Sequence, residues 1–242
     1  MSESFEGFKD MLNITEDYYN KYYLETKDEK YKEKLKLINI EVKRTLTEEF
    51  LNKNQIFASN LEEILKVLVL SNNQKYMSGM SFIAKMVLKI GNNDKIKSFI
   101  VLKNIFEDKN LKDIYENNTQ NIVNRFKIKF KEKMPLLFQH FEKNHLDSDF
   151  VNYWLMTLLC FNFDENIGEY VFKIYIKNRD FDIYFNAIIA ILMILENELL
   201  NKNYADIYII LCSTKISNIK FEKFVENLNK LFSGLNVKFY NH

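Results

Sequence analysis

Arginine is scarce in this chain, and its positions indicate where specialised chemistry could lie. Of the 34 lysine and arginine residues, only Arg44, Arg125 and Arg179 are arginine. The chain is also rich in asparagine, isoleucine, phenylalanine and tyrosine, which indicates a coding bias that replaces arginine by lysine wherever a plain positive charge suffices. Each remaining arginine therefore raises the question of what its planar, five-donor guanidinium does that an ammonium group cannot do.

Two short segments differ from ordinary helical sequence. In Ile38–Thr45, Arg44 ends an apolar and acidic pattern, and we expect an extended break over residues 44–47. A side chain at such a place can project into solvent from a fixed base. In Tyr76–Ala84, Gly79 is expected early in a helix, where glycine costs about 1 kcal/mol relative to alanine. Its presence suggests a close approach to the backbone, although the spacing of the apolar residues also fits simple core packing.

The elements that must position these segments are predicted to be helices. Five glycines and one proline among 242 residues are far below the usual ~12%, and strand-rich folds need both residues for their tight turns. The predicted fold class is all-α, with roughly ten helices and short connections. The apolar run Ala187–Leu195 is expected to be the central buried helix. A single multi-helix domain is expected, and a C-terminal helical lobe stays open as an alternative.

Other kinds of catalytic or metal site are not indicated. The internal histidines, His140 and His145, are five residues apart, so one helix face does not carry both, and no cysteine spacing fits zinc. The motifs GxxxxGK[ST], GxGxxG and GxSxG do not occur in the sequence. Cys160 and Cys212 lie in apolar runs and are expected to be small buried hydrophobes. We therefore expect no metal and no cofactor.

The charge balance and the apolar runs restrict the partners and the location. With 34 basic and 33 acidic residues, the net charge is +1, whereas a nucleic-acid binder should carry a basic excess. The mixed-sign run Lys27–Lys36 is expected to be a solvated face. No apolar run reaches the ~20 residues that span a bilayer. We expect an intracellular, reducing, cytoplasmic location without nucleic-acid binding or membrane insertion, and peripheral attachment to membranes or cytoskeleton through partners stays open.

The two unusual segments, in this order and separation, resemble the TBC domain, the all-helical module of Rab GTPase-activating proteins. The family motif I-x-x-D-x-x-R-T corresponds to Ile38-x-x-Glu41-x-x-Arg44-Thr45. The motif Y-x-Q-G-M-x-x-I-A corresponds to Tyr76-x-Ser78-Gly79-Met80-x-x-Ile83-Ala84. Downstream stretches are similar to later family motifs, at Pro135–Leu155 with His145, Leu146 and Trp154, and at Phe172–Ala187. The resemblance covers about residues 30–205.

The resemblance implies a catalytic chemistry for two positions. A small GTPase hydrolyses GTP slowly, and an arginine supplied by a second protein neutralises charge on the transferring phosphoryl group, which is worth ~10³–10⁵ in rate. Arg44 matches that arginine finger. The family glutamine that orients the attacking water corresponds to Ser78, whose hydroxyl is too short for that role. Gln74, one helical turn earlier, is not expected to replace it.

Four further motif positions are expected to bind the partner: Glu41, Thr45, Tyr76 and Gly79. Glu41 replaces the family's aspartate, and its longer carboxylate is expected to brace the segment that carries Arg44. By resemblance, residues 1–29 form an N-terminal helical extension, 30–205 the TBC-like domain, and 206–242 C-terminal helices that pack on the same domain.

Three functional hypotheses follow. In the first, the chain binds a Rab-type GTPase with weak or lost activation, which requires Arg44 to face an open groove and not to fold inward against a carboxylate. In the second, it is a non-catalytic scaffold, a subunit of a larger assembly, and the tyrosines of residues 18–23 serve either as a partner surface or as core packing. In the third, it is an unrelated helical bundle or repeat whose motifs coincide.

Overall fold

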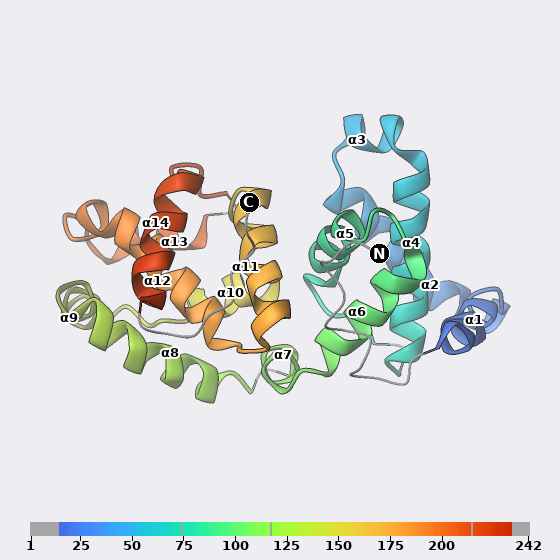
Figure 1. The fold of residues 1–242 in the computed structure, drawn as a ribbon, viewed down its shortest axis with the longest axis horizontal. Helices are drawn as coiled ribbons and strands as arrows, with labels where there is room; N and C mark the ends of the chain where they lie inside the picture. The colour runs from blue at the N-terminus through green and yellow to red at the C-terminus, as the bar shows by residue number, and fades with distance from the viewer. Residues whose placement is uncertain (1–14, 74, 117, 214, 234–242) are drawn as a thin grey trace. The chain divides into compact units, whose positions relative to one another are not determined.

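Helices make up the architecture in the part of the chain that the computed structural model describes, residues 15–73, 75–116, 118–213 and 215–233 (Figure 1). Within those ranges there are fourteen α-helices, one short 3-10 helix and no strand. The predicted all-α fold class is confirmed.

The helices up to residue 115 are α1 (Glu16–Glu25), η2 (Glu29–Tyr31, the 3-10 helix), α2 (Lys32–Thr45), α3 (Glu48–Lys53), α4 (Gln55–Ser71), α5 (Met80–Ile90), α6 (Lys95–Glu107) and α7 (Lys109–Tyr115). The later helices are α8 (Gln120–Lys133), α9 (Pro135–Lys143), α10 (Phe150–Met156), α11 (Glu165–Asn178), α12 (Asp182–Leu199), α13 (Tyr204–Cys212) and α14 (Phe221–Phe232).

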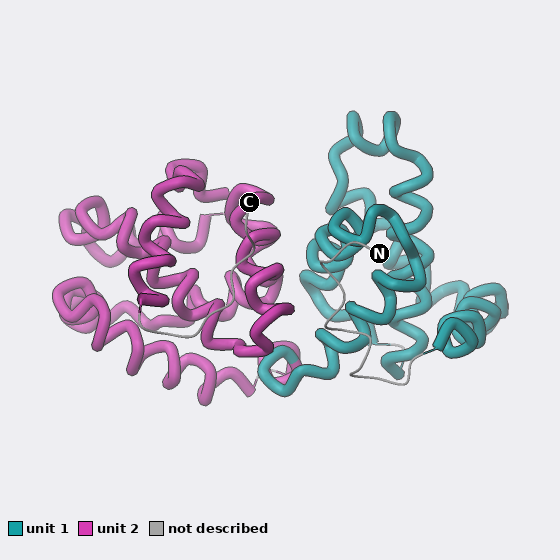
Figure 2. Tube along the Cα trace, in the orientation of Figure 1, with its two compact units in different colours: residues 1–111 teal, residues 112–242 magenta. Residues whose placement is uncertain are grey.

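The chain divides into two compact units, residues 1–111 and 112–242 (Figure 2). The boundary between them falls within α7, whereas the sequence-based division places its boundaries near residues 30 and 206. That three-part division stays a prediction. Its outer ends, residues 1–14 and 234–242, lie outside the described residues.

Unit 1 is built around α4, which packs against α1, α2, α3, α5 and α6 (Figure 1). The apolar face of α4 is fully buried at Leu61, Ile64 and Leu68, as its helical spacing requires. On α1, the ring of Tyr19 is only 3% exposed and meets the ring of Phe99 edge-on at 5.3 Å. The core-packing alternative for the tyrosines of residues 18–23 therefore holds for Tyr19.

Unit 2 is built around α12, which packs against α8, α11 and α14. Every residue from Ile183 to Leu192 is buried, because this stretch of the helix is apolar on nearly all sides. The prediction that Ala187–Leu195 forms the central buried helix is confirmed for the unit in which it lies.

The two cysteines differ from their prediction. Both are free thiols, and both are half-buried and not fully buried. Cys212 is the last residue of α13, a helix that buries only Ile207 and Leu211, so one side of α13 faces outward. Among the described helices, none has the length and apolar character needed to cross a membrane.

Candidate functional site

The end of α2 carries Arg44. Leu35, Ile38 and Val42 are spaced three and four residues apart and bury one face of the helix. The helix continues through Thr45, so the expected extended break over residues 44–47 is wrong at its first two positions. The Thr45 hydroxyl donates back to the Glu41 carbonyl, four residues earlier, at 2.7 Å. The backbone becomes extended only at Leu46, with φ −107° and ψ 138°.

The Arg44 side chain projects outward from this last turn. It is 69% exposed, and its Nη1 donates to Glu41 Oε1 at 2.9 Å, one helical turn earlier. The carboxylate of Glu41 is far less exposed, at 16%. Because exposed ion pairs contribute about 0–1 kcal/mol, this pair contributes orientation more than stability. The GTPase hypothesis requires that Arg44 does not fold inward against a carboxylate. Arg44 does contact the carboxylate of Glu41, but its side chain stays exposed to solvent.

A second oxygen of Glu41 binds the segment that precedes α5. Tyr76 Oη donates to Glu41 Oε2 at 3.3 Å, across 35 residues of sequence. Burial, together with the nearby Glu41 carboxylate, raises the pKa of Tyr76 to about 12. The phenol therefore keeps its proton at neutral pH and remains a donor. Glu41 is held between Tyr76 and Arg44 and links the two sequence motifs.

A buried hydroxyl pair joins the same two elements a short distance away. Thr45 Oγ1 and Ser81 Oγ lie 2.7 Å apart, and Ser81 is completely buried in the first turn of α5. Because the single Thr45 proton goes to the Glu41 carbonyl, the Ser81 hydroxyl is the donor to Thr45 Oγ1. No role for Ser81 was predicted from the sequence. The available signal was a small polar residue between Met80 and Ile83 on the buried face of a helix, where a polar group needs a partner.

Gly79 precedes α5 and does not lie within it, so its expected place early in a helix is wrong. It is the N-cap residue of α5, with φ 93° and ψ −16°. This left-handed conformation costs an L-residue with a side chain about 1–2 kcal/mol, which explains the glycine without a close helix approach. Tyr76, Met77 and Ser78 consequently lie in the connection before the helix.

The predicted site residues differ in what they contact and in how exposed they are. Glu41, Arg44, Thr45 and Tyr76 lie at one junction of α2 and the segment before α5, joined by the contacts above. Ser78 is exposed two residues after Tyr76. Unlike the exposed Ser78, both Thr45 and Gly79 are buried, and Thr45 is only 7% exposed.

Gln74 lies outside the described residues. Residues 75–77, which separate it from Ser78, are not helical, so the expected spacing of one helical turn does not apply.

The other two arginines have structural roles. Arg125 is hydrogen-bonded and ion-paired with Asp182, and its guanidinium lies 5.2 Å from the ring centre of Phe185. Arg179 ends α11 in a left-handed conformation, with its backbone N–H bonded to the Tyr175 carbonyl at 2.7 Å. Arg44 alone of the three stands on a motif of the resemblance.

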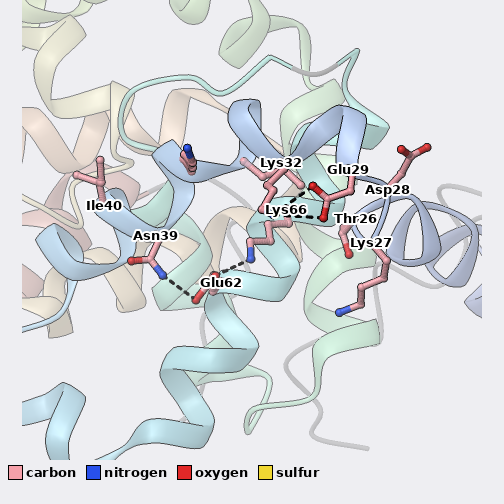
Figure 3. A pocket seen from close by; sticks show the side chains of 11 residues that line it. Thr26, Lys27, Asp28, Glu29, Lys32, Asn39, Ile40, Glu62 and Lys66 are labelled. Carbon is pink, nitrogen blue, oxygen red and sulfur yellow. Dashed lines mark hydrogen bonds and ion pairs between the residues drawn. The ribbon is translucent and has the colours of Figure 1, made fainter.

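A pocket of about 600 Å³ lies beside α2, on the part of the helix that precedes Arg44 (Figure 3). It is lined by Thr26, Lys27, Asp28, Glu29, Lys32, Leu35, Lys36, Asn39, Ile40, Glu62 and Lys66. Four lysines would suit a phosphate, but three acidic residues lie among them.

Two of the lysines in this pocket are paired with acidic residues that also line it. Lys32 pairs with Glu29 at 3.1 Å, and Lys66 pairs with Glu62 at 2.6 Å. Asn39 donates to the other oxygen of Glu62 at 3.4 Å, as the dashed lines in Figure 3 show. A mixed-sign lining of this kind fits the expected solvated face over residues 27–36 better than an anion site. In the described ranges, no group of three or more histidine, cysteine, aspartate or glutamate side chains could hold a metal ion.

Comparisons with known proteins agree with this arrangement. Residues 8–200 match the family described as the Rab-GTPase-TBC domain. The flagellar RabGAP TBC domain of Chlamydomonas is similar in structure, with a TM-score of 0.76 and 16% sequence identity. The match covers 96% of this chain and 77% of the Chlamydomonas chain. The Ypt/Rab-GAP domain of Gyp1p is also similar, with a TM-score of 0.70 and 15% sequence identity. The match covers 90% of this chain and 79% of the Gyp1p chain. A comparison with curated proteins finds no match.

Proposed function

Because this chain belongs to the Rab-GTPase-TBC domain family, we propose that it binds a Rab-type small GTPase and that Arg44 acts there as an arginine finger. Membership of the family removes the hypothesis of an unrelated helical bundle whose motifs coincide. The family, however, does not by itself specify what Arg44 and Ser78 do in this chain, and both roles are proposals.

The observation that carries the proposal is the mounting of Arg44. Its side chain is 69% exposed at the end of a helix, and its guanidinium is held by the largely buried carboxylate of Glu41 at 2.9 Å. Glu41 engages one terminal nitrogen, Nη1, so the guanidinium is oriented while most of its surface faces outward. A planar fork in this state can contact two phosphate oxygens at once, which a lysine ammonium cannot do.

The proposed chemistry is neutralisation of charge by Arg44 without help from position 78. The arginine stabilises the negative charge that develops on the transferring phosphoryl group. The Ser78 hydroxyl is shorter than a glutamine amide and cannot offer a donor and an acceptor at the same reach. We therefore infer that the attacking water is oriented by the GTPase's own glutamine and that activation is weak.

The buried motif residues act by positioning in this proposal. Thr45 at 7% exposure and the buried Gly79 offer little surface to a partner. Glu41 and Tyr76 are partly accessible and hold Arg44 in place through the two hydrogen bonds to the Glu41 carboxylate. Arg44 and Ser78 are the motif side chains that a GTPase would touch.

The test is single-turnover GTP hydrolysis by a panel of Rab proteins, with the full chain and with Arg44→Ala and Arg44→Lys. At least one Rab should be stimulated by the natural chain, and both variants should return its rate to the intrinsic value, because neither side chain makes a bidentate contact. Lys43→Ala removes a neighbouring exposed cation from the same helix turn and should leave the stimulation unchanged. Equal rates for the natural chain and Arg44→Ala across the panel would refute the arginine-finger role.

Ser78 also supports a second function, that of a non-catalytic scaffold subunit within a larger assembly. In that case the domain holds a protein partner and hydrolysis is unaffected. Pull-down with the full chain, followed by gel filtration of the recovered complex, distinguishes the two functions. A stable complex with no stimulated Rab supports the scaffold, whereas a chain found only as a free monomer contradicts it.

A further inference from the structure

A second pocket lies in unit 2, between the start of α10 and the outward face of α13. Its volume is about 200 Å³, and three tyrosines line it. Tyr153 comes from α10, while Tyr204 and Tyr208 are one turn apart on α13. The tyrosines are 56%, 49% and 47% exposed. Such a cluster of exposed aromatic rings marks an interaction surface more than a chance surface composition.

The pocket is held by a rigid base. The indole Nε1 of Trp154, which is fully buried on α10, donates to the carbonyl of Leu211 on α13 at 2.9 Å. Phe150 and Leu211 are buried and form part of the lining. A buried hydrogen bond across 57 residues of sequence fixes α10 against α13, so the three tyrosines are presented from a preformed frame.

The tyrosine rings lie close enough to act together. Tyr204 and Tyr208 are stacked, with ring centres 6.2 Å apart and planes 19° from parallel. The Cys212 thiol, followed by the Tyr153 hydroxyl, raises the pKa of Tyr208, which places these groups around one opening. The faces of the three phenol rings carry the negative quadrupole that attracts cations.

Two acidic side chains add negative charge to the lining of this pocket. Asp147 and Asp149 line the pocket, and none of the described lining residues is a lysine or arginine. Asp149 precedes α10, and its side chain makes no capping hydrogen bond to that helix, so its carboxylate remains available to a ligand. Asp147 has one weak contact, with Lys127 at 3.5 Å. Tyrosine faces with adjacent carboxylates suit a cation and disfavour an anion.

The size of the pocket favours one side chain over a whole metabolite. Sites for drug-sized ligands usually have about 300–1,000 Å³, more than the volume found here. An exposed apolar residue, Ile209 at 65%, follows Tyr208 on α13 and offers additional contact beyond the pocket. A polypeptide that inserts one basic side chain would use both features.

We propose that this tyrosine pocket, defined by Tyr153, Tyr204, Tyr208, Asp147 and Asp149, receives an arginine side chain of a partner polypeptide. A guanidinium stacks on aromatic faces and is more weakly hydrated than an ammonium, while the carboxylates accept its N–H donors. This binding site lies in unit 2 and goes beyond the proposed GTPase activation, because it involves neither Arg44 nor Ser78.

The experiment uses the full chain labelled with ¹³C in its 14 tyrosines, with Tyr153, Tyr204 and Tyr208 assigned by single substitutions. The probe is the blocked peptide Gly-Gly-Arg-Gly-Gly, and its matched control carries citrulline, a neutral isostere, in place of arginine. The arginine peptide should shift these three tyrosine signals in a saturable titration. The citrulline peptide should bind about tenfold more weakly, since it lacks the charge.

Substitutions test whether the arginine peptide binds in the tyrosine pocket. Tyr208→Leu keeps an apolar side chain but removes the ring, and should weaken binding about threefold; Asp149→Asn should do the same by removing the charge. Glu132→Gln, an exposed acid on α8 outside the pocket, should leave the titration unchanged. All three sites are at the surface, so melting temperatures should match the natural chain. Equal binding of the citrulline peptide, no binding of the arginine peptide, or shifts confined to other tyrosines would each overturn the proposal.

Discussion

The end of α2 and the segment before α5 meet at the candidate site, but they are built differently. Arg44 is exposed, and one nitrogen of its guanidinium is held by Glu41, which Tyr76 holds in turn. Ser78, on the other segment, is an exposed short hydroxyl. Most of the contacts at the junction therefore orient the arginine, while the position that carries the family glutamine has a side chain of little reach. Under the proposed function, the difference predicts that charge neutralisation and water orientation are separable in this chain.

The largest expected effect comes from placing a glutamine at position 78, because its amide reaches further than the serine hydroxyl. Ser78→Gln should raise the stimulated rate of GTP hydrolysis about 100-fold, the effect usually seen for one well-placed polar group in a transition state. Single-turnover assays with the responsive Rab measure it. Ser78→Asn, which has the same amide on a shorter stem, serves as the matched control and should gain much less. No gain with glutamine would favour the scaffold function.

The anchor of Arg44 is tested by removing the charge of Glu41. Glu41→Gln should lower stimulated hydrolysis about tenfold with little change in Rab affinity, because a neutral amide holds a guanidinium more weakly than a carboxylate does. The assay measures rate at saturating chain, in the natural and Ser78→Gln backgrounds. Glu33→Gln, an exposed acid two turns earlier on α2, should have no effect. An affinity loss with an unchanged maximal rate would instead make Glu41 a binding residue.

The turn before α5 gives a smaller effect, on stability. Gly79→Ala should lower the free energy of unfolding by about 1 kcal/mol, since its φ of 93° strains a residue with a side chain. Urea unfolding followed by circular dichroism measures the change. Ser78→Ala, at the adjacent exposed position, should stay within about 0.5 kcal/mol of the natural chain. Equal stability of the two variants would show that the turn relaxes without cost.

The smallest effect concerns alkaline pH. The pKa of Tyr76 is raised to about 12 from the unfolded value of about 10, so its contribution to stability is complete below pH 10 and is lost as pH rises through 12. Tyr76→Phe should reduce the alkaline loss by roughly 0.5 kcal/mol, a small value because the side chain is partly exposed. Denaturant titrations at pH 9 and pH 11.5, compared between the two chains, measure it. Parallel curves would contradict a role for the Tyr76 phenol.

The sequence by itself determined the fold class and much of the burial pattern. The scarcity of glycine and proline and the helical spacing of apolar residues predicted an all-α chain, and the apolar run of α12 predicted its burial. These properties are local, because a periodicity of 3.6 residues specifies which face of a helix avoids water. The sequence also placed Arg44 and Gly79 at unusual positions, although it placed the end of α2 and the start of α5 wrongly.

Only the tertiary structure decided which side chains meet. Ser81 pairs with Thr45 across 36 residues, Tyr76 with Glu41 across 35, and Trp154 with Leu211 across 57. No local pattern encodes such partners, because they depend on how complete helices pack and on the closure of long loops. For the same reason, the tyrosine pocket of unit 2 was invisible in the sequence, where Tyr153 and Tyr208 are far apart and each resembles an ordinary residue on a helix.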